Sequence, residues 1–235
     1  MAQQLPLQFE FRANQTFDDF FPGNNQEIIN HLKNCVDGSG ESFLFLSGKP
    51  GQGKSHLLQA SCQRAHTRNL RSFYFDLATA KLPDPLILSG LTACELVCLD
   101  NVEAVAGNSD WEQAFFNFFN EQRDQNYQLI LSAACSPLAL NIQLPDLKTR
   151  LNWGLTLKLK PFSDADKIAL LIFKADQMGF EITPQTGRFL ISHYDRNPES
   201  LWALLDKLNL ETLAAKRKLT VPFLKHILEQ EINGS

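Results

Sequence analysis

Residues 48–55 read Gly-Lys-Pro-Gly-Gln-Gly-Lys-Ser, which matches the pattern GxxxxGK[ST] at every specified position. A short apolar run before them, residues 42–47, favours a buried strand, and the apolar spacing of residues 55–66 favours a helix. A strand, a glycine-rich loop and a helix in this order form a phosphate-binding loop, because glycines let backbone N–H groups turn inward around a phosphate. The sequence therefore predicts a nucleotide site at Pro50, Gly51, Gln52, Gly53, Lys54 and Ser55.

The polar residues that follow the last glycine of this loop have chemical roles. The lysine ammonium of such loops reaches the terminal phosphates and the next hydroxyl coordinates Mg²⁺, which assigns these roles to Lys54 and Ser55. The helix that begins near Lys54 directs its positive dipole end at the same phosphate. His56 comes next and is a candidate for contact with the α-phosphate region. The expected ligand is ATP or ADP with Mg²⁺.

A phosphate-binding loop also needs an acid on a neighbouring strand, which holds Mg²⁺ through water. The apolar run 95–99 ends at Asp100, and the carboxyl end of a strand is where α/β sheets place ligands. Asn101 follows, where many motor ATPases have a glutamate that activates water. Because an amide cannot accept a proton from water, we expect slow intrinsic hydrolysis. Glu103 is a nearby acid, but it lies two residues beyond the position of that glutamate. Ser132 ends another expected strand and is the candidate polar sensor of the phosphate.

The order of the elements predicts an α/β fold. Five expected strands alternate with helices: 42–47, 72–77, 95–99, 128–132 and 155–159. This order indicates a mostly parallel five-stranded sheet flanked by helices. From residue 161 onward the pattern is helical, with expected helices from Ser163 to Met178 and over 183–193, 198–214 and 221–230. We therefore expect an N-terminal tail (1–15), an α/β nucleotide-binding domain (16–160) and a small helical domain (161–235).

Four aromatic residues at helical spacing, Trp111, Phe115, Phe118 and Phe119, have two interpretations. They could stack on nucleic-acid bases or form part of the core. Because no Lys or Arg is interleaved with them, the pattern favours the core.

Composition limits the classes of function. The 235 residues are 44% hydrophobic and 20% charged, which is typical of a globular protein, and 22 Lys and Arg against 26 Asp and Glu give a net charge of -4. This balance argues against nucleic-acid binding driven mainly by phosphate electrostatics. The five cysteines are scattered and form neither a disulfide framework nor a zinc pattern. Without a signal sequence or an apolar membrane span, we expect a soluble cytoplasmic protein.

The phosphate-binding loop, the strand ending at Asp100, Ser132, Arg150 and the helical C-terminal region together resemble the AAA+ family. Three segments are similar to the bacterial DnaA family in particular: 16–25, 114–120 and 144–155. The resemblance implies that the first of these, with Pro22 and Asn24, wraps the nucleotide base. It implies that Arg150, which follows an expected turn at Pro145 and Asp146, is an arginine finger that reaches the γ-phosphate of a neighbouring subunit. The helical domain would then be a lid, with Arg196 as a candidate phosphate contact.

Two features separate the chain from the initiator itself. Residues 4–9 resemble QLxLx[LF], the peptide with which bacterial proteins bind the replication sliding clamp; here Gln4, Leu5, Leu7 and Phe9 would make the contacts. The sequence also ends shortly after the lid, so we expect no helix-turn-helix DNA-binding domain and no sequence-specific DNA binding. With residues 216–223, these features resemble the regulatory inactivators of DnaA. The implied partners are the initiator DnaA and the β sliding clamp of DNA polymerase III.

Some positions depart from the family pattern and leave alternatives open. Glu199 stands where we align the lid arginine, so Arg196 either substitutes for it or is a surface residue, and Ala134 stands where the family often has an acid. The resemblance favours ADP over ATP as the working ligand. Since AAA+ modules pair head to tail, a homodimer is compatible with the sequence. The alternative function is an autonomous AAA+ ATPase of the helicase-loader type, against which Asn101 counts.

Overall fold

The computed structural model describes residues 15–193, 201 and 204–210, and the chain divides into two compact units, 1–160 and 161–235. The first unit contains a sheet of five strands: β1 (Phe43–Ser47), β2 (Ser72–Asp76), β3 (Leu96–Asp100), β4 (Gln128–Ala133) and β5 (Leu155–Lys158). All neighbours pair in parallel in the order β2-β3-β4-β1-β5. The predicted five-stranded parallel sheet is confirmed.

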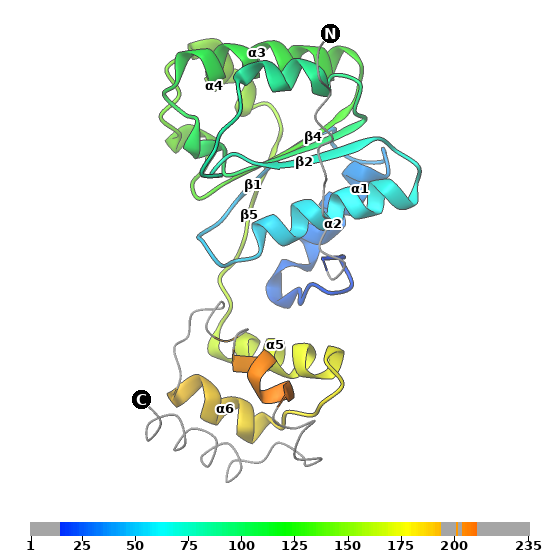
Figure 1. Ribbon diagram of the computed structural model, residues 1–235, viewed down its shortest axis with the longest axis vertical. Coiled ribbons are helices and arrows are strands. Elements are labelled where there is room, and N and C mark those ends of the chain that lie inside the picture. Colours follow the sequence, from blue (N-terminus) through cyan, green and yellow to red (C-terminus); the bar gives the residue numbers. More distant parts are fainter. Residues whose placement is uncertain (1–14, 194–200, 202–203, 211–235) are drawn as a thin grey trace. The chain divides into compact units, whose positions relative to one another are not determined.

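Helices cover both faces of this sheet, α1 (Gln26–Val36) and α2 (Lys54–Thr67) on one face and α3 (Ser109–Asp124) and α4 (Pro145–Leu151) on the other (Figure 1). Short 3₁₀ helices complete the unit: η1 (Gly23–Asn25), η2 (Pro85–Leu91), η3 (Val102–Ala104) and η4 (Pro137–Ala139). Every residue of β1 and β3 is buried, which explains why these strands are continuous apolar runs.

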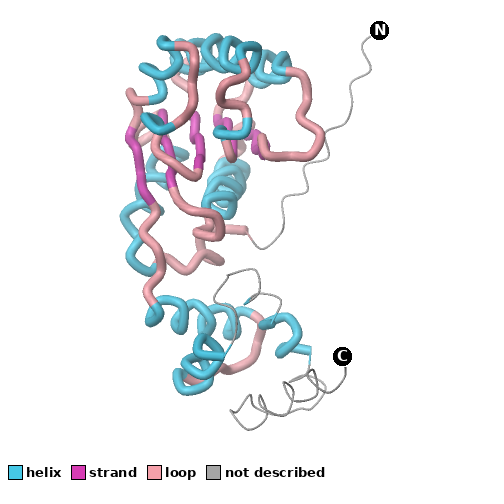
Figure 2. Tube along the Cα trace, turned by 90° about the vertical axis from the view of Figure 1, so that its left-hand side faces the viewer, coloured by secondary structure: helices cyan, strands magenta, loops and turns pink. Residues whose placement is uncertain are grey.

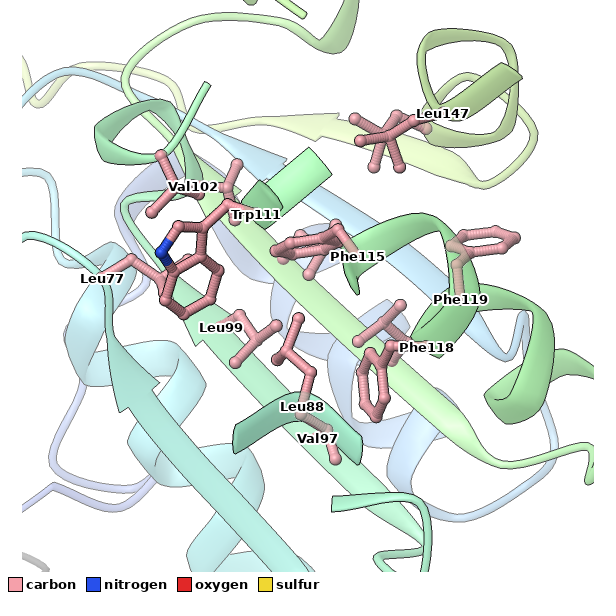
Figure 3. Packing of buried hydrophobic residues seen from close by; sticks show 14 of the residues in the cluster. Leu77, Leu88, Val97, Leu99, Val102, Trp111, Phe115, Phe118, Phe119 and Leu147 are labelled. Atoms are coloured by element: carbon pink, nitrogen blue, oxygen red, sulfur yellow. The ribbon is translucent and has the colours of Figure 1, made fainter. Parts of the chain in front are cut away.

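The aromatic face of α3 lies in the core. Trp111, Phe115, Phe118 and Phe119 are each at most 4% exposed and pack with Leu88, Val97 and Leu99 from η2 and β3 (Figure 3). The core interpretation of this stripe is therefore confirmed. Asn108 begins the helix, because its side-chain oxygen accepts from the backbone N–H groups of Asp110 and Trp111.

Helix α4 is a difference from the sequence prediction, which treated Pro145 and Asp146 as a turn. Pro145 instead opens a helix of seven residues that carries Arg150. Proline suits a first helical position because its missing N–H would have no partner inside the helix. Leu147 and Leu151, one turn apart, are buried against the α3 side of the sheet, which keeps this short helix in place.

The carboxylate of Glu112 joins α3 to the start of α4. It is 3% exposed and accepts from the backbone N–H groups of Gly107 (2.7 Å), Gln143 (2.9 Å) and Leu144 (2.7 Å). Leu144 is the residue directly before α4. One buried acid on α3 thus fixes the segment from which the Arg150 helix begins.

We expect Glu112→Ala to lower the free energy of unfolding by about 3–5 kcal/mol, because several inward-facing N–H groups lose their acceptor and each costs about 1–3 kcal/mol. Glu112→Gln keeps one carbonyl oxygen and should lose about half as much. Urea denaturation measures both values. A loss below about 1 kcal/mol for the alanine variant would contradict this role of Glu112.

The second unit contains helices α5 (Asp164–Gln177) and α6 (Pro184–His193), and every regular element described in it is helical (Figure 2). Ser163 and Asp166 form a capping box at the start of α5. A separate apolar core includes Leu171, Leu190 and Leu205. The helices expected over 198–214 and 221–230 lie largely or wholly outside the described residues. No helix among the described residues is long and apolar enough to cross a membrane.

Candidate functional site

The glycine loop connects β1 to α2 and lies at the carboxyl edge of the sheet. Gly51 and Gly53 have φ angles of 77° and 87°, in the left-handed region that side chains disfavour. A Cβ at Gly53 would also lie 2.5 Å from a ring carbon of Phe20. Gln52 supports the loop from inside, because its side-chain oxygen accepts from the backbone N–H of Lys49 at 2.6 Å. Gly51 and Gly53 are therefore required by the path of the backbone, and Gly53 also by the approach of Phe20.

Lys54 is the buried cation of this loop. It is 6% exposed, and its ammonium donates to the backbone oxygens of Gly48 at 2.8 Å and Lys49 at 3.4 Å. Among the described residues, no carboxylate forms an ion pair with it. A buried charge ordinarily needs an opposite charge, and two neutral carbonyls leave one of its three donors available. The loop thus fits an anionic ligand such as a nucleotide phosphate.

Asp100 lies at the end of β3 and is fully buried. One carboxylate oxygen accepts from the hydroxyl of Ser132 and from the backbone N–H of Asn101. The other oxygen accepts from the Tyr74 hydroxyl at 3.0 Å. Burial and the charge of Asp100 raise the pKa of Tyr74, so the phenol stays protonated and donates.

The sheet order brings the sequence-predicted polar residues to one edge. Strand β4 lies between β1 and β3, so Ser132 stands between the glycine loop and Asp100. Ser55 follows Lys54 in the first turn of α2. A Mg²⁺–nucleotide could be held here by Lys54, Ser55 and Asp100, and the metal would supply charge neutralisation at the phosphates.

Asn101 does not have the arrangement expected of a water-activating residue. Its backbone is left-handed, with φ 55°, and its side-chain amide donates to Asp76 at the end of β2 at 2.8 Å. Asp76 also accepts from the backbone N–H of Ala78. The sequence did not identify Asp76 or Tyr74 as part of this site, because each lies about 25 residues before its partner.

Glu103 follows in η3. One oxygen of its carboxylate accepts from the backbone N–H of Ala134 at 2.8 Å, directly beyond the end of β4. The other oxygen is buried and has no hydrogen-bond partner among the described residues. Glu103 therefore stabilises the loop after Ser132, and Ala134 contributes its backbone N–H to this contact.

The segment before α1 lies against the glycine loop. A ring nitrogen of His56 is 2.7 Å from the backbone oxygen of Thr16, and its ring meets Phe20 edge to face. His56 therefore contacts the N-terminal segment of the domain. Pro22 directly precedes η1, and Asn24 lies within it and is exposed.

Asn25 is a residue of this segment that the sequence did not single out. It is 2% exposed and exchanges two hydrogen bonds with the backbone of Lys160, at 2.8 and 3.2 Å. These bonds tie η1 to the chain just after β5. The signal in the sequence, an Asn next to another Asn in a turn, does not distinguish such a residue.

Helix α4, which carries Arg150, lies on the α3 side of the sheet, away from the face that α2 covers (Figure 1). The Arg150 guanidinium donates to the side-chain oxygen of Asn120 and lies 4.5 Å from the ring centre of Phe116. No carboxylate among the described residues pairs with it. Four other arginines do contact one: Arg64, Arg68, Arg71 and Arg123. Arg150 is thus a guanidinium held by neutral groups.

Several sequence-predicted contacts lie outside the described residues and stay predictions. They are the clamp-binding residues Gln4, Leu5, Leu7 and Phe9, the lid residues Arg196 and Glu199, and the segment 216–223.

Comparison with family models identifies two regions. Residues 88–158 match the bacterial DnaA ATPase domain, and residues 164–228 match the Hda lid domain. The first match contains Asp100, Ser132 and Arg150. The second covers most of the helical unit.

Solved structures show the same fold. A replication initiator DnaA bound to AMPPCP and single-stranded DNA matches with a TM-score of 0.74 and 21% identity, over 88% of this chain and 69% of that chain. Domain III of the DnaA protein from Thermotoga maritima has the same score and identity, over 89% and 93%. The RuvB Holliday junction branch migration motor from Thermotoga maritima matches at 0.69 and 16%, over 94% and 73%. The chain thus contains a region that matches the DnaA ATPase domain, followed by one that matches the Hda lid domain, and its fold is that of the DnaA structures.

Proposed function

We propose that this protein is a negative regulator of chromosomal replication initiation. It binds a nucleotide and, together with the DNA-loaded sliding clamp, stimulates hydrolysis of the ATP held by the initiator DnaA. Arg150 is the residue that acts on that ATP. The observation that carries the proposal is the guanidinium of Arg150, which has no carboxylate partner among the described residues. Helix α4, which carries it, covers the face of the sheet opposite to the phosphate-binding helix α2 (Figure 1).

Arginine suits this task chemically. A guanidinium is always charged and grips phosphate oxygens through two N–H groups at once. An arginine paired with a carboxylate would first have to give up that partner, whereas the contacts of Arg150 with the described residues are to the Asn120 amide and to aromatic rings. Its charge is therefore available to the γ-phosphate of a neighbouring AAA+ domain.

The bound nucleotide is proposed to be structural, with ADP favoured. Asp100, Ser132 and Lys54 provide binding groups, but the residue after Asp100 is an amide whose side chain is hydrogen-bonded to Asp76. Nothing at this position can accept a proton from water, which supports slow hydrolysis by the protein itself. Lys54 and Ser55 would still hold the diphosphate, and Phe20 and His56 would connect it to the N-terminal segment.

The clamp contact is assigned to the N-terminal residues 4–9. We expect Leu5→Ala together with Leu7→Ala to abolish binding to the isolated β clamp, because both apolar side chains that would enter its pockets are lost. Surface plasmon resonance with immobilised clamp measures the affinity. Ala2→Ser is the matched control in the same tail and should bind normally; unchanged affinity of the double variant would reject the tether.

The function is tested with initiator loaded with ATP and with clamp loaded on DNA. Adding the protein should raise the rate of ATP hydrolysis on the initiator, and removing the clamp or using the Leu5 and Leu7 double variant should reduce this rise. If clamp and nucleotide states are verified and the protein still gives no stimulation, the regulator function is wrong.

A further inference from the structure

Trp153 is an exposed aromatic residue beside Arg150. Its side chain is 57% exposed, although indole rings are usually largely covered in folded proteins. It lies in the turn between α4 and β5, where its backbone N–H donates to the backbone oxygen of Arg150 at 3.0 Å. Trp153 and Arg150 are therefore part of one tight turn.

The ring of Trp153 takes part in a stack of alternating cations and aromatic rings. The Arg150 guanidinium lies 5.1 Å from the indole and 4.5 Å from the ring of Phe116. The Arg123 guanidinium lies 5.8 Å from the same indole. Arg150 thus has one aromatic neighbour from α3 and one from its own turn.

The backbone under Trp153 holds the ring in this place. The next residue is Gly154, where a Cβ would lie 2.6 Å from the backbone oxygen of Phe43 and 2.3 Å from its ring. The turn therefore lies directly on β1, and a side chain at position 154 would displace it. The indole also packs edge to face with the buried ring of Phe119, with centroids 6.4 Å apart.

We propose that Trp153 is a positioning residue for Arg150, and that its indole holds the guanidinium extended at the surface for a neighbour's phosphate. This inference rests on the proposed function of Arg150. A free arginine samples many rotamers and loses this freedom when it grips a phosphate. The stack on Trp153 and Phe116 restricts the side chain before the partner arrives, through cation–π attraction that leaves the N–H edge available.

The test uses the clamp-dependent assay at saturating amounts of this protein. Trp153→Ala should lower the maximal stimulated rate about tenfold, while the concentration giving half of the effect changes less than about threefold. Trp153→Phe keeps an aromatic face and should restore the rate to within about threefold of the wild type. An alanine variant with the wild-type maximal rate, or a phenylalanine variant as defective as the alanine one, overturns the proposal.

A second measurement tests the stack without any hydrolysis. The measurement is acrylamide quenching of Trp153 fluorescence. The emission of Trp153 is obtained by subtracting the emission of the Trp153→Phe protein from that of the protein with Trp153. Because Arg150 covers one part of the indole, Arg150→Ala should make Trp153 easier to quench, and equal quenching would overturn the stack. If the wild-type protein does not stimulate hydrolysis, the proposed function fails, and the quenching result still decides whether Trp153 holds Arg150.

Discussion

Arg150→Ala is expected to lower the stimulated rate of ATP hydrolysis on the initiator by about 10³-fold or more, to the rate seen without the regulator. Arginine fingers contribute about 10³–10⁵ to hydrolysis in other nucleotide triphosphatases, because they stabilise the charge that develops on the transferred phosphate. Single-turnover release of phosphate from prebound ATP measures the effect. Arg150→Lys should recover little, because an ammonium lacks the planar pair of donors.

Arg123→Ala is the matched control for this prediction. Arg123 stacks on the same indole, but its guanidinium contacts Asp124 at 3.1 Å and is half exposed. Its removal should change the rate less than about threefold, since an exposed ion pair contributes little. Equal losses in the Arg123 and Arg150 variants would show that positive charge on this face, and not a finger, is responsible.

The second large effect concerns Lys54. We expect Lys54→Ala to weaken binding of ADP about 100-fold, because charged hydrogen bonds to the phosphates contribute roughly 1.5–3 kcal/mol and about 1.4 kcal/mol corresponds to tenfold in affinity. Isothermal titration calorimetry measures the affinity. Thermal unfolding without nucleotide should be recorded in parallel, because the ammonium also donates to the loop carbonyls of Gly48 and Lys49.

Lys49→Ala provides the control within the same loop. The Lys49 side chain is exposed, and the contacts that support the loop come from its backbone N–H and oxygen, which the substitution keeps. Its affinity for ADP should stay within about threefold of the wild type. If Lys54→Ala binds ADP as tightly as Lys49→Ala, the glycine loop is not the phosphate site.

The parts of the structure that follow from local pattern were predictable. Continuous apolar runs gave the buried strands β1 and β3, and helical spacing of large aromatic residues gave the core face of α3. The capping box at Ser163 uses contacts only three residues apart. The glycine loop is equally local, since its conformation depends on glycines at set spacing and on the strand and helix around it.

Contacts between distant segments were not predictable from a single sequence. Tyr74 meets Asp100, Asp76 meets Asn101 and Glu112 meets Leu144 only because the parallel sheet brings separate strands and loops together. The helical start at Pro145 was mistaken for a turn, because proline followed by an acid is common in both. Asn25 gives no local signal, although its two bonds to Lys160 connect the ends of the α/β domain.

Whether this protein acts on the initiator's ATP is decided by following which protein's nucleotide is hydrolysed. The initiator is loaded with γ-labelled ATP and this protein with unlabelled ADP, and both are combined with clamp on DNA. We expect rapid release of label from the initiator with wild-type protein and none above the basal rate with Arg150→Ala. Release that occurs only when this protein itself carries labelled ATP would reject the regulator function and establish an autonomous ATPase.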